Sequence, residues 1–488
     1  MTRAVTLLLG VHAHQPVGNF PEVIEDAHRR CYKPFLETLN AYPDFRFAAH
    51  FSGWLLDWLR VRFPDDMEML AGMVRRGQVE MFSSGDTEPV LAAIPHRDRV
   101  GQLATLNDKL AAWTGVRPQG AWLTERVWES AVVPALAETG IRYVTVDDYH
   151  FFCTGRGAAE LDGHFSTEED GTCLDLFPIS EALRYRLPFH PAHEVVAYLE
   201  QLADRGQRAA IYFDDIEKFG IWPETYDWVY NRGWLKALIE GILASPRIDT
   251  ATYADFHARN ATRGIVYLPT ASYSEMNEWT LPMPAAATYA HLLAQEKAAG
   301  RGELHRPFIR GGIWRNFLSR YPEANWMHKR MQALSARLAT VPDAPPGLTD
   351  ALYRAHAAHF ATLPPHPSVT AHPAPDAAGP LPGPLQINAP AEVLRHSEHL
   401  LAAQFPGFAV PTVHCHDLPE LVAAVRAQPH EAVVKPLAEC SGRGIAFFLP
   451  DAPAPALAAY WAALAPAARS SSPTSPRSPP AATCGSWS

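Results

Sequence analysis

Short apolar runs alternate with longer segments of helical spacing over the first 335 residues or so. The runs include "VTLLLGV", "FRFAAHF", "RYVTVDD" and "RAAIYFDD", and one of the helical segments is "RDRVGQLATLNDKLAAWTG". Continuous apolar runs indicate strands buried on both faces, and their alternation with helices indicates a parallel sheet. Several runs end in polar or charged residues, which suits a barrel whose sites collect at the carboxyl ends of its strands. This part of the chain is therefore predicted to be an α/β protein built as a β/α barrel.

The pattern changes beyond this region. Pro and Ala are frequent over residues 336–385, which predicts a linker interrupted by one helix near "ALYRAHAAHFATL". Residues 386–450 have the pattern of a small, truncated α/β piece, and residues 451–488 end in a Ser/Pro-rich stretch typical of a disordered tail. We therefore expect a catalytic barrel over 1–335, followed by these three parts.

Composition narrows the choice of partner and compartment. The chain has 488 residues and a formal net charge of -10, which argues against a nucleic-acid or anionic-membrane partner. Its 6 cysteines show no CxxC spacing, so the sequence predicts a reducing cytoplasm rather than a disulfide framework or a zinc module. The apolar stretch near the N-terminus lacks the features of a signal peptide, and no run is long enough to span a bilayer. The oligomeric state is left open.

Two histidines follow the first apolar run in "HAHQP". His12 and His14 are two residues apart, so on a strand both side chains point to the same side. They could donate hydrogen bonds to a polar ligand, bind a divalent metal, or satisfy polar groups of the core. A metal would need a third ligand, for which Asp86, Glu88 or an aspartate of "FDDIEKFG" is the best candidate. A metal-dependent barrel hydrolase is therefore one hypothesis.

Carboxylates follow two other apolar runs. Glu125 lies in "GAWLTERVWE", and Asp214, Asp215 and Glu217 lie in "YFDDIEKFG". A buried carboxylate must be paired, face a cavity or take part in chemistry, and like charges in one site raise one pKa enough to provide a proton donor. Two such carboxylates, about 5 to 5.5 Å apart, are the apparatus of a retaining glycosidase. The alternative for the second cluster is a solvated acidic turn paired with Lys218.

Tryptophans recur beside these polar clusters. Aromatic rings edged by hydrogen-bonding groups bind the flat C–H faces of sugars, so a carbohydrate site is favoured, although any single tryptophan is more often a core residue. The residues concerned are Trp122, Trp128, Trp222, Trp228, Trp279 and Trp314.

Five segments, in order along the chain, carry a family resemblance. "HAHQP", "GQVEMFSSGDTEPVLAAIP", "GAWLTERVWE", "FDDIEKFGIWP" and "SYSEMNEWTLP" resemble the five motifs of glycoside hydrolase family 57, and most closely those of its 4-α-glucanotransferases. The resemblance covers about residues 5–335 and continues into "RGGIWRNFLSRYPEANWMHKRM". It implies an incomplete (β/α)7 barrel with a helical extension that processes α-1,4-glucans with retention, using no metal or other cofactor.

By position in these motifs, the resemblance implies that Glu125 is the catalytic nucleophile and Asp215 the general acid/base. It also implies a set of residues that bind an α-glucan or maltooligosaccharide: His12, His14, Glu88, Trp122, Asp214, Glu217, Trp222, Glu275 and Trp279. The expected activity is that of a 4-α-glucanotransferase. An α-amylase-type hydrolase and a non-catalytic α-glucan-binding relative are the alternatives.

The sequence also departs from the family pattern. Phe213 and Ile216 replace the His and Gly of the usual HDDGEKFG, and Ser130 follows Glu129 where relatives have Gln-Pro or Glu-Pro. After Arg330, a helical segment with an aromatic, acidic motif and a β-sandwich domain are expected from the family but are not recognisable in the sequence. Such losses would open the substrate groove and weaken activity.

A second resemblance lies in residues 386–450. "INAPAEVLRHSEHLLAAQFPGFAVPT" and "EAVVKPLAECSGRGIAFF" resemble the middle of a glutathione-synthetase-type ATP-grasp ligase, which implies Lys435 as the phosphate lysine and Gly442 and Gly444 as part of a glycine loop. The metal-binding acidic and Asn residues of such an enzyme do not follow, so we expect a truncated module without ATP-dependent catalysis.

Overall fold

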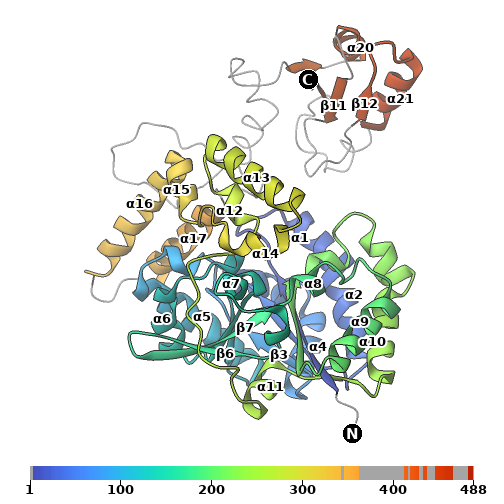
Figure 1. The fold of residues 1–488 in the computed structure, drawn as a ribbon. Helices are drawn as coiled ribbons and strands as arrows, with labels where there is room; N and C mark the ends of the chain where they lie inside the picture. The colour runs from blue at the N-terminus through green and yellow to red at the C-terminus, as the bar shows by residue number, and fades with distance from the viewer. Residues whose placement is uncertain are drawn as a thin grey trace. The chain divides into compact units, whose positions relative to one another are not determined.

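The computed structural model describes residues 4–341 and 346–361, and then 412–415, 418–427, 432–436, 446–464 and 482–486 (Figure 1). The chain divides into two compact units, Met1–Leu363 and Pro364–Ser488. Each unit is described by itself.

Parallel strands follow one another around a barrel in the first unit. They are β1 (Val5–Ala13), β2 (Phe47–Phe51), β3 (Val79–Phe82), β4 (Gly120–Trp122), β5 (Tyr143–Asp147), β7 (Thr172–Ile179) and β8 (Ala209–Asp215). At two places neighbouring strands share few hydrogen bonds. β3 and β4 are joined by an isolated bridge between Ser83 and Ala121. β7 and β8 are joined by a hydrogen bond of 2.9 Å from the Ser180 amide to the Ile211 carbonyl. The predicted incomplete (β/α)7 barrel is confirmed. Two further strands, β6 (Phe165–Glu169) and β9 (Ile248–Thr250), pair with β7 and with the start of β1.

Helices surround these strands, as Figure 1 shows. Around the barrel they are α1 (Pro21–Ala27), α2 (Lys33–Asn40), α3 (Gly53–Arg62), α4 (Pro64–Arg75), α5 (His96–Thr114), α6 (Val133–Glu138), α7 (Asp148–Phe152), α8 (Glu181–Arg184), α9 (Ala192–Asp204), α10 (Trp234–Ala244) and α11 (Tyr253–Arg259). Several begin with a proline in the first turn, where its missing N–H costs nothing, and α5 ends at Gly115, whose φ of 80° suits a glycine.

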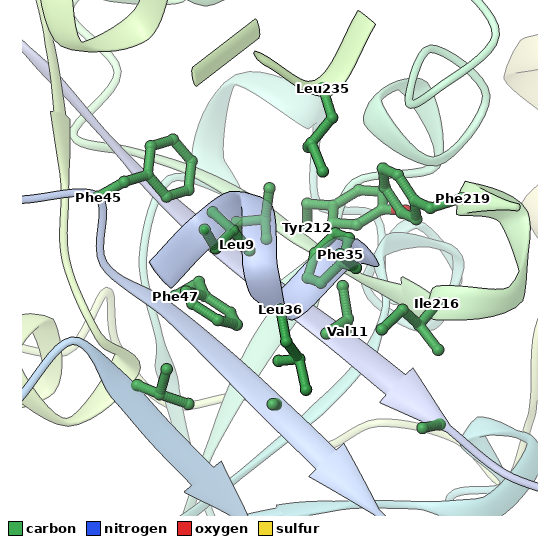
Figure 2. Packing of buried hydrophobic residues seen from close by; sticks show 14 of the residues in the cluster. Leu9, Val11, Phe35, Leu36, Phe45, Phe47, Tyr212, Ile216, Phe219 and Leu235 are labelled. Carbon is green, nitrogen blue, oxygen red and sulfur yellow. The ribbon is translucent and has the colours of Figure 1, made fainter. Parts of the chain in front are cut away.

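Each strand of the barrel has an inner and an outer apolar face, which explains the continuous apolar runs of the sequence. Leu8 packs inside the barrel with Phe82 and Phe213. The neighbouring residues Leu9 and Val11 point outward and pack with Phe35, Phe47 and Tyr212 under the helices (Figure 2). Gly10 leaves room for the ring of Phe213, because a Cβ at this position would come within 2.2 Å of it.

A helical extension follows the barrel. It consists of α12 (Met276–Trp279), α13 (Met283–Ala298), α14 (Gly302–His305), α15 (Asn316–Arg320), α16 (Pro322–Leu338) and α17 (Pro346–Ala361). The residues Leu352 and Tyr353 of α17 are buried in the same hydrophobic cluster as residues of β4 and α6. The boundary expected at residue 335 therefore falls inside α16, and the helix expected within the linker is packed against the barrel unit.

Buried polar contacts also hold the extension. Asp98 of α5 accepts a hydrogen bond of 2.6 Å from Ser335 of α16 and contacts His356 of α17 at 3.2 Å. The Thr87 hydroxyl donates a hydrogen bond of 2.8 Å to the carbonyl of Tyr353. Both helices are thus fixed to α5, and α17 is also fixed to the loop that precedes α5.

The described part of the second unit is a small sheet with two helices. The strands are β10 (Thr412–Cys415), β11 (Ala432–Pro436), β12 (Ala446–Phe448) and β13 (Ala482–Ser486), in the order β10-β13-β11-β12, and the helices are α20 (Leu418–Arg426) and α21 (Ala454–Leu464). Leu457 of α21 is buried against Leu421 and Val425 of α20. This packing orders part of the range expected to be a disordered tail, and β13 lies in that range as well.

Lys435 lies in β11, whereas Gly442 and Gly444 lie outside the described residues, so the predicted glycine loop is not described. In the described part of the chain, no helix has both the length and the apolar character needed to cross a bilayer.

Candidate active site

The predicted site residues gather at the carboxyl ends of the barrel strands. Glu125 follows β4 in a short 3-10 turn (Thr124–Arg126), and Asp215 ends β8. His12 of β1 lies between His50 of β2 and Asp215 in the strand register. Neighbouring strands are about 4.8 Å apart, so these three residues share one edge of the barrel interior.

Three residues of this edge have left-handed backbone angles. Glu88, Glu125 and Arg126 have φ values of 55°, 53° and 49°. A residue with a side chain pays a steric cost for this conformation, and such strain clusters at functional sites because the surrounding structure must enforce it. The fold therefore holds these side chains in place at the expense of local stability.

Tyr273 and Ser272 fix Glu125. The Tyr273 hydroxyl donates a hydrogen bond of 2.5 Å to Oε2 of Glu125, and the Ser272 hydroxyl donates to its backbone carbonyl. The Arg126 guanidinium lies 4.7 Å from the centre of the Tyr273 ring. These contacts hold the carboxylate in one orientation beside a permanent cation. Neither Tyr273 nor Arg126 was among the residues predicted as functional, although both lie within the quoted motifs.

The adjacent aspartates Asp214 and Asp215 have different environments. Asp214 is fully buried and accepts hydrogen bonds from Arg126 at 3.2 Å, from Arg184 at 3.0 Å and from Lys218. Burial alone would raise the pKa of Asp214, but these three cations outweigh it and hold the pKa well below its usual range. Asp214 is therefore a charge-balancing residue of the wall, rather than a group open to a ligand.

Asp215 points to the barrel interior, in register with His12. Among the described residues, no hydrogen bond is made to its carboxylate. Its charge acts on the groups around it: it raises the pKa of Tyr273, Arg126 and His12. The carboxylate of Asp215 and that of Glu125, which also acts on Tyr273, therefore belong to one electrostatic environment.

Glu88 joins the two histidines of "HAHQP". Its carboxylate oxygens contact Nε2 of His12 at 3.1 Å and Nδ1 of His14 at 2.6 Å. Burial lowers the pKa of His12, but the charge of Glu88 and its hydrogen bond outweigh burial and raise this pKa to about 9. Burial likewise raises the pKa of Glu88, and the two histidines outweigh it and bring it well below the usual range. His12 and Glu88 are thus held as a buried ion pair.

His50 continues this chain of hydrogen bonds. Its Nδ1 lies 2.8 Å from Nδ1 of His12, and its Nε2 lies 2.7 Å from the Ser84 hydroxyl, which donates to the carbonyl of Gly85. Burial lowers the pKa of His50 to about 3, so His50 is neutral. A protonated His12 then donates through Nδ1, and His50 donates through Nε2 to Ser84. Sequence reasoning missed His50, although its place at the end of a parallel apolar run could have indicated it.

Glu217 lies close to Asp215 and is half-buried. The strand ends at Asp215 and a 3-10 turn (Ile216–Phe219) follows, so Glu217 is not part of the strand. Tyr32 donates a hydrogen bond of 2.6 Å to it. Burial, followed by the charge of Asp215, raises the pKa of Glu217 to about 7. The structure thus brings Glu217 near Asp215 but holds it on Tyr32. Lys218 pairs with Asp214, as the hypothesis of an acidic turn expected, but this pair is buried and not solvated.

Some of the predicted tryptophans are buried, and others are exposed at the rim of the barrel mouth. Trp122 is buried and stacks on His12 with 4.4 Å between ring centres. Trp222 and Trp279 are 42% and 40% exposed, and Trp279 packs edge-on against Tyr273, 5.9 Å away. The exposed ring of Trp279, next to the tyrosine that binds Glu125, can stack on a sugar face. Trp128 and Trp314 are buried in the hydrophobic core, and Trp228 packs against the outer core.

Glu275 lies near this rim. It accepts a hydrogen bond of 3.0 Å from Tyr185, which is 54% exposed. The pair offers a carboxylate and a hydroxyl to a ligand that lies against Trp279.

Phe213 and Ile216, the two departures from the family pattern around Asp215, are both buried. Phe213 packs inside the barrel below Trp122, with 5.1 Å between ring centres, and so replaces a polar group by an apolar one. Ile216 is buried in the outer core, and its φ is not positive, so the loop has no need of a glycine there.

Three donor atoms of His12, His50 and Glu88 lie within 4.8 Å of one another, a spacing that could hold a metal ion. In the structure these groups satisfy one another by hydrogen bonds. Of the carboxylates considered as a third ligand, Glu88 reaches the histidines and Asp86 pairs with Lys109 at 2.7 Å. The prediction of a metal-free site stays a prediction.

A β/α barrel with carboxylates, histidines and exposed tryptophans at its mouth has the architecture of a carbohydrate-active enzyme. The comparisons with known proteins agree. Residues 8–269 match the model of glycosyl hydrolase family 57, and residues 312–360 match that of the α-amylase/4-α-glucanotransferase middle domain. The chain belongs to glycosyl hydrolase family 57. The helical segment that was expected to be missing after Arg330 is therefore present at least to residue 360, which corrects that expectation.

Several relatives are similar over much of this chain. A 4-α-glucanotransferase of Thermococcus litoralis and an α-amylase of Pyrococcus furiosus are each 45% identical to it over 341 residues, which is 70% of this chain and 52% of each relative. The crystal structure of the T. litoralis 4-α-glucanotransferase superposes with a TM-score of 0.70 at 43% identity, covering 73% of this chain and 55% of that one. The chain thus spans about half the length of the curated relatives it matches. Both family matches end by residue 360, so the resemblance of residues 386–450 to an ATP-grasp ligase stays a prediction without support from them.

Proposed function

We propose that this chain is a retaining α-glucan-acting enzyme, and that it works as a 4-α-glucanotransferase. The observation that carries the proposal is the pair of carboxylates at the mouth of the barrel. Glu125 is oriented by Tyr273, and Asp215 faces the interior without a competing hydrogen bond among the described residues. One carboxylate held in place and one free to exchange a proton are what a double displacement requires.

In this mechanism Asp215 protonates the glycosidic oxygen while Glu125 attacks the anomeric carbon. The C–O bond to the leaving sugar breaks and a covalent glycosyl–enzyme ester forms. Asp215, now a carboxylate, takes a proton from the hydroxyl of an acceptor, whose oxygen displaces Glu125. A sugar acceptor gives transfer and a water acceptor gives hydrolysis.

The surrounding residues support these roles. Asp214 fixes Arg126 beside Glu125, so a permanent cation adjoins the nucleophile. His12 is positively charged, and Glu88 and His50 hold its ring in one orientation, so it can donate only to the partners the chain provides. Trp279 and Trp222, both exposed at the rim, are the surfaces on which we expect glucose rings to stack.

Transfer is proposed over hydrolysis because the resemblance of the motifs is greatest to 4-α-glucanotransferases, and because one of the 45%-identical relatives bears that name. The α-amylase names among the relatives make hydrolysis the natural alternative. A cytoplasmic location stays a prediction.

The test is incubation of the purified chain with maltotriose, with products resolved by chromatography. Glu125→Gln and Asp215→Asn are measured beside the wild type, and Asp249→Asn, an exposed position on β9, serves as the control. We expect longer and shorter oligosaccharides to appear together, and to disappear in the first two variants only.

Shortened products alone would assign hydrolysis to the same two residues. Turnover that survives in Glu125→Gln or Asp215→Asn would refute their catalytic roles. Binding of maltooligosaccharides without any turnover by the wild type would show that this chain is a binding relative and not an enzyme.

A further inference from the structure

Two histidines and an aspartate meet at the opposite end of the barrel from the carboxylates. His164 precedes β6, Asp175 lies in β7 opposite Tyr143, the first residue of β5, and His257 belongs to α11. One ligand atom of each lies within 4.8 Å of those of the other two. Asp175 is four residues before the end of β7 at Ile179, which places the cluster roughly 13 Å along the strand from the active-site edge.

The histidines differ in their bonding. His257 Nε2 lies 2.6 Å from Oδ2 of Asp175, and the other oxygen of this carboxylate accepts a hydrogen bond of 2.6 Å from Ser166. His164 is 3% exposed, its Nε2 lies 4.0 Å from the same Oδ2, and its buried Nδ1 has no hydrogen-bond partner. Among the described residues, no hydrogen bond is made to either ring nitrogen of His164. A buried polar side chain left without partners costs about 1–3 kcal/mol, so its retention needs an explanation.

The residue types and spacing are those of a metal site. Zinc in proteins binds His nitrogens and carboxylate oxygens at about 2.0–2.2 Å in a tetrahedron, which sets its ligand atoms about 3.4 Å apart. The separations of 2.6 and 4.0 Å found around Oδ2 of Asp175 lie on either side of this value, so a small shift of the His164 ring would meet it.

Positive charges near the cluster are balanced. Arg208 acts on His164, but both Arg208 and Arg263 pair with Asp162, at 3.7 and 2.9 Å. The charges around the cluster therefore do not exclude a divalent cation bound to the carboxylate of Asp175.

We propose that His164, Asp175 and His257 bind one divalent transition-metal ion of the zinc type, with the fourth position open to water. The ion takes the position of the proton between Nε2 of His257 and Asp175, and the neutral imidazole of His257 then carries its proton on Nδ1. Because its ligands come from α11 and from the hairpin of β6 and β7, the ion ties α11 to a hairpin that lies much earlier in the sequence. Its role is to stabilise the base of the barrel and not to take part in the sugar chemistry.

The test uses the full chain after treatment with a chelator. Cobalt(II) is titrated in, with its visible absorption as the readout, and zinc chloride is added to displace it, while Tm is followed by differential scanning calorimetry. We expect one equivalent of cobalt to bind and zinc to displace it. At free zinc 100 times the Kd, Tm should rise by about 4 °C, and Mg²⁺ should have no such effect.

Variants assign the site. In His164→Gln, binding and the rise in Tm should disappear, and His257→Gln, whose amide can still donate to Asp175, provides a second variant if the first fails to fold. Glu88→Gln, which removes the carboxylate of the other histidine cluster, should keep both effects. Absence of stoichiometric binding, binding unchanged in both histidine variants, or loss of binding in Glu88→Gln would overturn the proposal. None of these outcomes depends on glucan turnover.

Discussion

Two neighbouring aspartates are predicted to fail in opposite ways when each is replaced by asparagine. Asp214 is fully buried between three cations, whereas Asp215 faces the barrel interior without a hydrogen bond from any described residue. Asp214→Asn removes the counter-charge that Arg126, Arg184 and Lys218 share. Asp147 still pairs with the two arginines, at 3.4 and 2.9 Å, but Lys218 loses its carboxylate partner. Breaking a buried ion pair by removing one partner costs about 3–5 kcal/mol, because the remaining charge is left uncompensated.

This loss translates into a measurable temperature shift. The entropy of unfolding is about 2.1 cal/mol/K per residue, so a unit of roughly 350 residues gives about 0.7 kcal/mol/K. We therefore expect Asp214→Asn to lower Tm by about 4–7 °C. Asp215→Asn breaks no ion pair and should leave Tm within about 1 °C, while general acid/base catalysis worth about 10²- to 10⁴-fold is lost.

Calorimetry at pH 7 measures Tm for both variants, and maltotriose disproportionation is assayed well below the lower Tm. Equal falls in Tm for the two variants would refute the division of roles. So would a wild-type Tm for Asp214→Asn, because the three cations would then not depend on this carboxylate.

Three further changes are predicted from the same site. Tyr273→Phe removes the hydrogen bond to Glu125, worth about 1.5–3 kcal/mol to a charged acceptor, so kcat/KM should fall about 10- to 100-fold with little change in Tm; an unchanged kcat/KM would contradict this role. The pKa of Glu217 is raised from 4.5 to about 7, so its native state keeps a proton that the unfolded state loses, and wild-type stability declines between pH 4.5 and 7. Glu217→Gln should therefore gain in Tm over the wild type at pH 8 but not at pH 4, and a constant difference would refute the argument. His356→Ala removes the contact of α17 with Asp98. Because α17 also holds Thr87, next to Glu88, this change should lower activity. KM and kcat are measured below the unfolding temperature, and full activity would contradict this coupling.

Much of the barrel could be predicted from the sequence, because its strands are buried on both faces and appear as continuous apolar runs. The helical spacing of α5 and the polar residues at strand ends were visible in the same way. The boundary near residue 335 was misplaced because local composition cannot show that Leu352 and Tyr353 are buried against the barrel. That packing depends on a partner more than 200 residues earlier in the chain, in β4 and α6.

The candidate site was predicted in its residues but not in its connections. The family resemblance located Glu125, Asp215, His12 and Glu88, which the structure brings to one end of the barrel. The alternation of side chains along a strand places Asp214 and Asp215 on opposite sides. Asp214 was placed among the ligand-binding residues by the family resemblance, which does not contain its contacts with three cations. His50 and Tyr273 were missed because each acts through one hydrogen bond to a predicted residue. The spacing of residues along the chain does not reveal such a hydrogen bond between distant segments.

The contact between Thr87 and Tyr353 gives this catalytic unit an order of assembly. Glu88 follows Thr87 directly, and Gly101 of α5 leaves room for the Tyr353 side chain, since a Cβ there would come within 2.1 Å of its hydroxyl. A chain emerging from the ribosome exposes both acidic residues of the mechanism and the HAHQP histidines long before it reaches α17. The loop that carries Glu88 gains the hydrogen bond between Thr87 and Tyr353 only after α17 has been synthesised, so a chain that ends before Tyr353 holds every predicted catalytic group but lacks this support.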